Sequence, residues 1–370
     1  MKAVQFTRFG PADVLEVVEL PVPEPEPGEV LVRVHAAGVN FFEVLMRADR
    51  YAVTPDLPMF PGVEVAGTIE RAGPGSDRSL IGARVAVPLF AIGRGSGGYA
   101  EFVAVDGGAV VHLTDALSFA AAAGLMVQGL TALHLLRRSP AKGKNVLVSS
   151  AAGGVGSLLV QLARRDGAKM LIAAASSEEK RALSLSLGAD HAVDYTAPGW
   201  QEDVKKLTGG LGADIIYETV GGAFSRAALD ALAPCGELVL AAMGRFGLEA
   251  ADVEHMLDDN QSIKGFSLLP LLTPQGVQED LAELFKLAAA GALTVIDGGR
   301  FPLHQAAEAH RAIEGRRAVG KVVLVPKIEE GDARCRAIAL GIMHRQSDRG
   351  GDLHGKLAER CFGGGAGEYV

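Results

Sequence analysis

The sequence has few cysteines and no excess of basic residues. Its three cysteines, Cys235, Cys335 and Cys361, among 370 residues are too few and too scattered for a disulfide framework or a four-thiolate zinc site. This scarcity favours a reducing compartment, so we expect a cytoplasmic protein. The formal net charge of -8 argues against a nucleic-acid partner, because nucleic-acid-binding proteins usually carry a basic face.

We find no apolar run long enough to span a membrane, and residues 1–20 lack the unbroken apolar core of a signal peptide. The expectation is a soluble protein without a membrane partner. Hydrophobic residues make up 48% of the chain, which allows a large core. The 47 glycines cluster at turns, and the length suits two domains better than one.

The first third of the chain has the pattern of short strands. Segments rich in valine and leucine are bounded by proline and glycine, and their regular spacing is typical of a small β-barrel. From about Ser118 the pattern becomes helical, with leucine, alanine and methionine in place of β-branched residues. The predicted elements of this part are strands at 14–20, 29–39, 62–76 and 82–90, then a helix at 117–138.

The middle of the chain alternates strands with helices. Such alternation predicts a parallel sheet with helices on both faces. The predicted strands are 145–150, 168–176, 191–195, 213–221 and 236–244, and the predicted helices are 154–165, 178–187, 201–207 and 224–232.

Residues 151–156, Ala-Ala-Gly-Gly-Val-Gly, lie between the first strand and the first helix of this series. The dinucleotide-binding fingerprint G-x-G-x-x-G occurs in this context; here Ala151 replaces its first glycine, while Gly153 and Gly156 keep the other two. Gly153 lets the backbone approach a pyrophosphate, and Gly156 lets the helix pack against the strand. Unpaired N–H groups and the positive end of the helix dipole would face the phosphates. A simple packing turn is the weaker interpretation.

The residues after the second strand favour NADPH over NADH. An NAD site usually has Asp or Glu about twenty residues after the turn, at the ribose 2′-OH, but this strand ends at Ala175 and Ser176. The hydroxyls of Ser176 and Ser177, with Lys180 one helical turn later, suit a 2′-phosphate. Another role for Ser176, compatible with the first, is to cap the helix, with Glu179 completing a capping box.

Eight segments then point to a family. In chain order they are AAGVNFFEVLMRADRY, PGVEVAGTIERAG, GGYAEFVAV, QGLTALHLLRR, AAGGVGSLLVQLARRDGA, GADHAVDY, DIIYETVGG and GRRAVGKVVL. This order resembles that of the medium-chain dehydrogenases/reductases, and most of all their zinc-independent quinone oxidoreductase (zeta-crystallin-like) branch. The resemblance covers residues 1 to about 326.

The resemblance implies an α/β protein of two domains. A GroES-like β-barrel catalytic domain would comprise residues 1–122 and 296–326, and a Rossmann domain with a doubly wound parallel sheet would comprise residues 123–295. NADPH would bind in the cleft between them. Residues 327–370 mix charges with glycine runs, and we expect a disordered tail there.

The resemblance also implies which residues hold the cofactor. For Gln128, packing at a helix N-terminus is an equally good interpretation. The candidates are Ser176, Lys180, Tyr195 and either Arg316 or Arg317 at the 2′-phosphate, Gln128 and Thr131 beside the nicotinamide, and Ala152, Gly153, Gly154, Val155, Gly156, Val220 and Met243 elsewhere along the cofactor.

Two zinc ligands of the zinc-dependent relatives are missing. The active-site loop has Gly38 and Val39 where a thiolate would be expected, and the relatives' Gly-His-Glu motif has Val63 in place of histidine. His35 and Glu64 remain, but a zinc site needs three protein ligands. We therefore expect no metal.

Alcohol oxidation benefits from a metal that acts as a Lewis acid, whereas hydride transfer to an electron-poor acceptor does not need one. The expected absence of a metal therefore favours hydride transfer to such an acceptor. Asn40 resembles an active-site asparagine whose amide can bond the cofactor or the substrate carbonyl. Tyr51 matches a pocket tyrosine that can donate a hydrogen bond or a proton. Leu45 replaces a second pocket tyrosine and makes the pocket more apolar, which weakens the case for a quinone.

The expected function is an NADPH-dependent reductase of quinones. One alternative is a reductase of α,β-unsaturated carbonyl double bonds in enals, enones or enoyl thioesters. Another is a nucleotide-binding protein with little turnover, like the crystallin relatives. Residues 260–272 resemble the strand and loop that pair subunits in this family, so we expect a homodimer.

Overall fold

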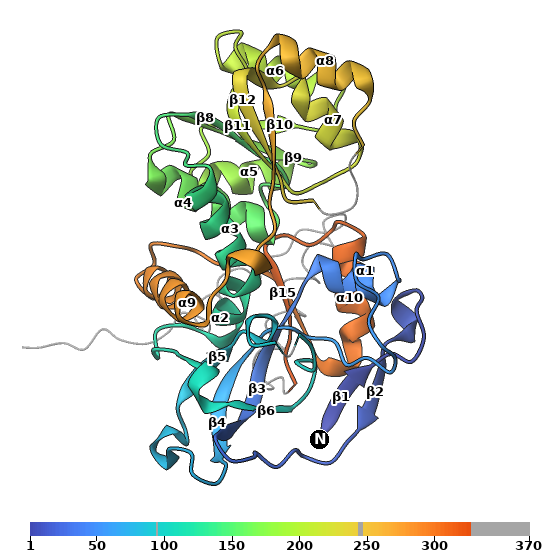
Figure 1. The fold of residues 1–370 in the computed structure, drawn as a ribbon, viewed down its shortest axis with the longest axis vertical. Helices are drawn as coiled ribbons and strands as arrows, with labels where there is room; N and C mark the ends of the chain where they lie inside the picture. The colour runs from blue at the N-terminus through green and yellow to red at the C-terminus, as the bar shows by residue number, and fades with distance from the viewer. Residues whose placement is uncertain (94, 243–246, 327–370) are drawn as a thin grey trace, which may run out of the picture. The chain divides into compact units, whose positions relative to one another are not determined.

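The computed structural model describes residues 1–93, 95–242 and 247–326. Met1–Lys327 form one compact unit, whose ribbon is shown in Figure 1. Met243 and the predicted tail at 327–370 lie outside the described residues.

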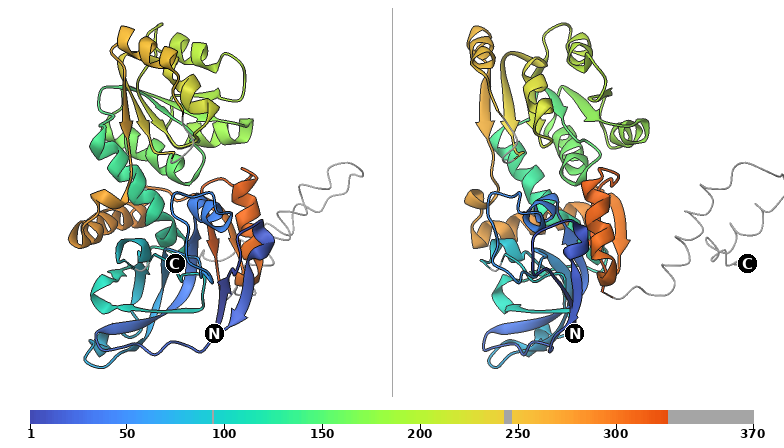
Figure 2. Two further views of the ribbon diagram at one scale, coloured as in Figure 1. Left: turned by 45° about the vertical axis from the view of Figure 1, so that its right-hand side comes forward. Right: turned by 90° about the vertical axis from the view of Figure 1, so that its right-hand side faces the viewer.

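A mainly antiparallel sheet is formed by the first third of the chain and completed by its last strands, of which β14 and β15 pair in parallel. Strand β15 (Lys321–Leu324) pairs antiparallel with β3 (Glu29–Val39), and β14 (Asp297–Phe301) pairs with β15. The C-terminal part of the unit therefore returns to its N-terminal part (Figure 1 and Figure 2). The sheet order is β14-β15-β3-β4-β5-β7, with β6 paired to β3. The remaining strands of this part are β1 (Lys2–Gln5), β2 (Glu16–Glu19), β4 (Val65–Ala72), β5 (Arg84–Val87), β6 (Phe102–Asp106) and β7 (Val111–His112).

A six-stranded parallel sheet is formed by the middle of the chain. Its order is β10-β9-β8-β11-β12-β13, the doubly wound arrangement in which the chain changes direction between β8 and β11. Ligands of such sheets bind beyond the carboxyl ends of the strands at this point. The strands are β8 (Asn145–Val148), β9 (Met170–Ala175), β10 (His191–Asp194), β11 (Ala213–Glu218), β12 (Leu232–Leu240) and β13 (Ser262–Gly265). The predicted fold class is confirmed.

Helices connect the strands of the parallel sheet and pack against both sheets. Their apolar positions follow the helical repeat, as in α4, where Leu158, Leu159 and Leu162 are buried. The helices are α1 (Phe41–Arg47), α2 (Phe119–Leu125), α3 (Val127–Arg138), α4 (Gly154–Asp166), α5 (Glu178–Ser186), α6 (Trp200–Leu207), α7 (Ala223–Leu229), α8 (Ala250–Asp258), α9 (Pro274–Ala289) and α10 (Ala306–Glu314).

Two of the predicted helices differ from those in the structure. The helix expected at 224–232 ends at Leu229, because Leu232 pairs with Ala213 as the first residue of β12 and Pro234 excludes a helical continuation. The helix expected at 117–138 is broken at Met126, whose ψ of -80° separates α2 from α3. Helix propensity alone cannot place either boundary.

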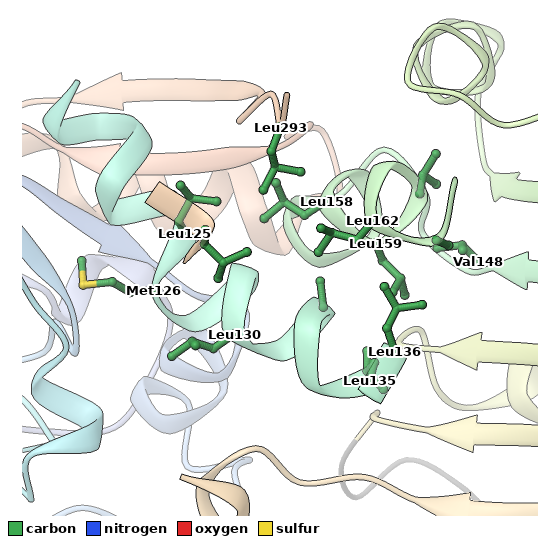
Figure 3. Packing of buried hydrophobic residues seen from close by; sticks show 14 of the residues in the cluster. Leu125, Met126, Leu130, Leu135, Leu136, Val148, Leu158, Leu159, Leu162 and Leu293 are labelled. Atoms are coloured by element: carbon green, nitrogen blue, oxygen red, sulfur yellow. The ribbon is translucent and has the colours of Figure 1, made fainter. Parts of the chain in front are cut away.

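The segment Phe119–Arg138 also corrects the expectation that no apolar segment could span a membrane. Its length and mean hydropathy of 1.6 would suffice, but 56% of the apolar window is buried inside the protein. Figure 3 shows its side chains, including Leu130 and Leu135, in one cluster with leucines of α4 and with Leu293. The high hydropathy of this segment is therefore explained by burial of α2 and α3 in the protein core.

Gly156 allows α4 to lie against the end of β8. A Cβ atom at this position would be 2.2 Å from the carbonyl oxygen of Ser150. We expect Gly156→Ala to lower the free energy of unfolding by about 1–3 kcal/mol, although alanine is the better helix former. The matched control is Gly247→Ala, since no atom of the described residues lies within 4 Å of a Cβ there. Equal urea-unfolding midpoints for the two variants would contradict the packing role of Gly156.

Candidate functional site

The turn between β8 and α4 has the shape of a phosphate-binding turn without the first glycine. Ser150 has a φ of 47°, and the Gly153 N–H donates to the Ser150 carbonyl oxygen at 2.8 Å. The left-handed residue is therefore Ser150, and Ala151 needs no special conformation. This geometry explains why the fingerprint holds with alanine at position 151.

The first turn of α4 leaves donors for an anion. The helix begins at Gly154, so the N–H groups of Gly154, Val155 and Gly156 have no carbonyl partner one turn earlier in the helix. Such groups, with the helix dipole, form an anion site. The carbonyl of Ala152 is held by the Gly320 N–H at 2.8 Å, so the other side of the turn is anchored to the segment before β15.

Gln128 lies against this turn. A Cβ atom at Gly154 would be 2.2 Å from the Gln128 amide carbon, so glycine at position 154 makes room for the glutamine. Thr131, one turn further along α3, donates its hydroxyl to the Val127 carbonyl oxygen at 2.6 Å. Both predicted nicotinamide-side residues are therefore on α3, with Gln128 at the phosphate turn.

The residues predicted for a 2′-phosphate are partly brought together. Lys180 Nζ donates to the carbonyl oxygen of Arg316 at 2.6 Å. Burial, and then the neighbouring Arg316 charge, lower the pKa of Lys180. Two cationic groups thus lie close together beyond the end of β9, where half-buried Ser176 follows the strand. The expectation that Ser176 caps α5 is wrong, because Ser177 is the cap and accepts from the Lys180 N–H at 3.4 Å.

A pocket of about 540 Å³ opens beside these cations. Tyr195, Val220 and Arg316, all predicted to contact the cofactor, are among its lining residues. Its aromatic wall includes Phe224, which stacks on Trp200 with ring centroids 5.0 Å apart and meets Tyr195 edge-on at 5.2 Å. The pocket therefore combines an aromatic wall with a basic residue, Arg316.

The Asn40 amide is held on all sides by charged groups of the protein. Asn40 is 3% exposed. Its Oδ1 accepts from Lys321 Nζ at 2.9 Å, and its Nδ2 donates to Glu64 Oε1 at 2.9 Å and to Glu43 Oε2 at 3.2 Å. The expectation that this amide is available to the cofactor or substrate therefore needs revision, because both of its N–H bonds already have protein acceptors.

Glu43 continues this network into the core. Its Oε1 accepts from the Gly62 N–H at 2.8 Å, and Tyr99 donates to its Oε2 at 3.4 Å. The Tyr99 hydroxyl is also 3.2 Å from His310 Nε2. Burial, reinforced by the Glu64 charge, raises the pKa of Glu43 to about 7. Burial and the Arg47 charge lower the pKa of His310 to about 3, so this histidine is neutral.

Comparison with known proteins identifies the family. The Alcohol dehydrogenase GroES-like domain matches residues 26–115, and the Zinc-binding dehydrogenase family matches residues 154–290. A quinone oxidoreductase of Pseudomonas aeruginosa is 35% identical over 334 residues, covering 88% of this chain and 99% of that protein. The chain belongs to the quinone oxidoreductase branch of the medium-chain dehydrogenases/reductases.

Two other relatives carry information about ligands. The structure of the quinone oxidoreductase from Thermus thermophilus, also solved in complex with NADPH, is 37% identical, with a TM-score of 0.74 over 88% of this chain and all of that one. A 2-haloacrylate reductase of Burkholderia is 32% identical over 340 residues, covering 88% of this chain and 99% of that protein. Proteins that are named for different acceptors are thus similar to this chain over nearly their whole length.

Because one matched family is described as zinc-binding, the positions of the relatives' zinc ligands matter in this chain. Val63 is buried and carries no ligand atom. A side chain at Gly38 would be 2.1 Å from Glu64 Oε1, so a cysteine there would displace that carboxylate. His35 is exposed, 3.2 Å from Thr68 Oγ1 and stacked on Phe119, whereas Glu64 is fully buried. Among the described residues, no three His, Cys, Asp or Glu side chains gather as metal ligands.

The residues predicted to line the acceptor pocket are partly buried and mostly apolar. Tyr51 is half-buried, its ring lies 5.6 Å from that of Phe42, and burial raises the pKa of its hydroxyl. Leu45 is half-buried on α1. Arg317 is exposed and, unlike Arg316, is not among the lining residues of the 540 Å³ pocket.

The roles of Glu43 and Lys321 were not predicted from the sequence. Lys321 begins the otherwise apolar strand KVVL, all four residues of which are buried. Glu64 stands in the apolar segment GVEVAG and was noticed only as a possible zinc ligand. A charged residue within an apolar strand is the available signal, since a buried charge requires a partner.

The buried Glu43 carboxyl makes a pH-dependent contribution to stability. With its pKa raised from 4.5 to about 7, the folded state binds a proton in this window that the unfolded state does not, so this contribution falls as pH rises. Glutamine has no such proton. The free energy of unfolding of Glu43→Gln, minus that of the wild type, should therefore increase between pH 5 and pH 7 by up to about 1.4 kcal/mol per pH unit.

Urea unfolding of both proteins across this range measures the difference. The control is Glu24→Gln, because Glu24 is 79% exposed and its difference from the wild type should stay flat. A flat difference for Glu43→Gln as well would show that Glu43 ionises normally.

Proposed function

We propose that this chain is an NADPH-dependent quinone reductase that works without zinc. The observation that carries the proposal is the pair of neighbouring cations, Lys180 and Arg316, beyond the end of β9 and beside the aromatic pocket. NADPH differs from NADH only by the 2′-phosphate, and neighbouring cations are the groups that bind such a dianion.

Each part of the cofactor has residues suited to hold it. The N–H groups of the first turn of α4 would bind the pyrophosphate. Ser176, Lys180 and Arg316 would bind the 2′-phosphate, with Arg316 preferred over Arg317 because Arg316 lines the pocket. Tyr195 and Val220 would contact the adenine half. Gln128 and Thr131 would lie on the nicotinamide side, and bound NADPH supplies the hydride.

The protein's contribution to the reaction is to position the acceptor and exclude water. A quinone accepts hydride at an electron-poor centre, so positioning can suffice without a Lewis acid. The half-buried Tyr51 hydroxyl, with its raised pKa, stays protonated at neutral pH and can donate a hydrogen bond to the oxygen that becomes negative.

A second acceptor class is favoured by one residue and one relative. Leu45 makes the pocket more apolar than a tyrosine would, and a relative of similar identity is named 2-haloacrylate reductase. The alternative is therefore reduction of a double bond conjugated to a carbonyl or carboxyl group.

We further propose a cytoplasmic homodimer with two domains, the catalytic one at 1–122 and 296–326 and the cofactor domain at 123–295. Strand β13 is the last strand of its sheet, with only β12 as a neighbour among the described strands. Leu257 and Leu269, on either side of it, are 71% and 59% exposed. An open sheet edge flanked by exposed leucines is a surface that pairing with a second copy would cover.

The proposed activity can be tested in one assay. We expect the protein, dialysed against a metal chelator, to oxidise NADPH in the presence of a simple quinone at an undiminished rate. A parallel reaction with an enone and with 2-chloroacrylate tests the alternative. Faster turnover of these acceptors would replace quinones as the substrate class, loss of activity on chelation would reject the zinc-free mechanism, and NADPH binding without turnover would identify a binding protein.

The proposed 2′-phosphate site predicts a selective effect. Lys180→Glu should weaken NADPH binding by tenfold or more, since it reverses a charge beside the phosphate, and should change NADH binding by less than about threefold. The single tryptophan, Trp200, lines the pocket, so quenching of its fluorescence reports binding of both nucleotides. Lys206→Glu, on the exposed surface of α6, is the control. Equal weakening of both nucleotides would reject the assignment.

A further inference from the structure

A buried ion pair lies at the junction of the antiparallel sheet and α3. Lys321 Nζ is 2.5 Å from Glu64 Oε1, and the two side chains are 2% and 0% exposed. Such a pair gives little net stability over well-packed apolar residues, because both charges lose their water. Its presence therefore calls for a reason other than stability.

The carboxylate of Glu64 is shared among elements that carry the proposed site. Its Oε2 accepts from the Val127 N–H at 2.7 Å, and Val127 is the first residue of α3, directly before Gln128. Its Oε1 accepts from Asn40 at the start of α1. Glu64 thus fixes the start of α3 relative to the start of α1.

Lys321 fixes the orientation of Asn40. Its ammonium group donates to Asn40 Oδ1 at 2.9 Å, while Asn40 Nδ2 faces the carboxylates of Glu43 and Glu64. Turning the amide by half a rotation would place its N–H bonds against the ammonium and its oxygen against the two carboxylates. Only one orientation of Asn40 is compatible with these charges.

The residue before Lys321 contacts the phosphate turn. Gly320, with a φ of 54°, donates to the Ala152 carbonyl oxygen at 2.8 Å and pairs with Gly153. Two consecutive residues therefore connect the phosphate turn with the buried pair.

We propose that Lys321 is a positioning residue for hydride transfer, acting through Glu64 and Asn40 to hold the nicotinamide side of the site. This inference rests on the proposed function. Lys321 itself touches neither cofactor nor acceptor in this proposal. Through Glu64 it sets where α3 begins, and through Asn40 it sets where α1 begins.

The test compares Lys321→Met with Lys264→Met. Lys264 also pairs with a glutamate, Glu237, at 2.8 Å, but bonds the C-terminal end of α3 rather than its start. We expect Lys321→Met to slow single-turnover hydride transfer by tenfold or more, with NADPH affinity, measured by Trp200 quenching, changed less than threefold. Lys264→Met should change hydride transfer by less than twofold. Equal rates for the two variants would overturn the inference.

Loss of Lys321 leaves a buried carboxylate without its cation, so this variant could fail to fold. The double variant Lys321→Met with Glu64→Gln removes both charges. It should recover the melting temperature lost in Lys321→Met but keep the slow hydride transfer, because glutamine lacks one of the two acceptors that Glu64 presents to Val127 and Asn40. Recovery of both would show that the pair is only structural.

A readout without an acceptor separates this inference from the proposed function. The fluorescence of the bound reduced nicotinamide depends on its surroundings and needs no turnover. It should change in the Lys321→Met and double variants and not in Lys264→Met. If the wild type binds NADPH but reduces no acceptor, the proposed function fails, while unchanged nicotinamide fluorescence in both Lys321 variants overturns the positioning role.

Discussion

The need to neutralise one fully buried carboxylate determines how the parts of this protein meet. Glu64 lies in an apolar segment directly before β4, and a charge in such surroundings is tolerated only when it is paired and hydrogen-bonded. Its partners come from β15, from the start of α1 and from the start of α3. Because these elements are far apart in the sequence, the pairing constrains the antiparallel sheet, the helix before the parallel sheet and the last strand together.

The cationic groups of the molecule are arranged in two contrasting ways. Lys321 is buried and its charge is matched by Glu64. Lys180 is bonded to a backbone carbonyl and has Arg316 as a neighbour. Within the described part of the chain no carboxylate forms an ion pair with either cation, so positive charge gathers at this end of the proposed site. A phosphate would offset that charge. Residues 316–321 contribute to both arrangements, since Arg316 lies beside Lys180 and Lys321 pairs with Glu64. Between these two residues, Gly320 bonds the turn at 151–156 through the Ala152 carbonyl oxygen.

The sequence predicted local structure well where local patterns decide it. Strand β3 has the predicted bounds, because its valines and alanines lie between proline-rich and helix-starting residues. The turn at 151–156 was placed correctly despite Ala151, since Gly153 and Gly156 lie between a strand and an amphipathic helix. The cap of α5 was misplaced by one residue, because Ser176 and Ser177 have the same chemistry and only the backbone angles distinguish them.

What the sequence could not supply is contact between distant residues. Lys321 and Glu64 are 257 positions apart, and no sequence motif around either residue predicts that the two are in contact. The role expected for Asn40 was likewise incomplete, because its amide bonds depend on Glu43, Glu64 and Lys321 meeting around it.

Under the proposed function, a fixed cofactor side and a variable acceptor side would follow from where the charges lie. The groups around Asn40 are buried and mutually bonded, so a change in one of them disturbs the others. Leu45, Tyr51 and Phe42 are only partly buried, and apolar contacts of this kind can change shape without disturbing a charge. A protein built in this way can exchange one electron-poor acceptor for another while its hydride donor stays in place. This arrangement agrees with the names of two relatives of similar sequence identity, one named for quinones and the other for 2-haloacrylate.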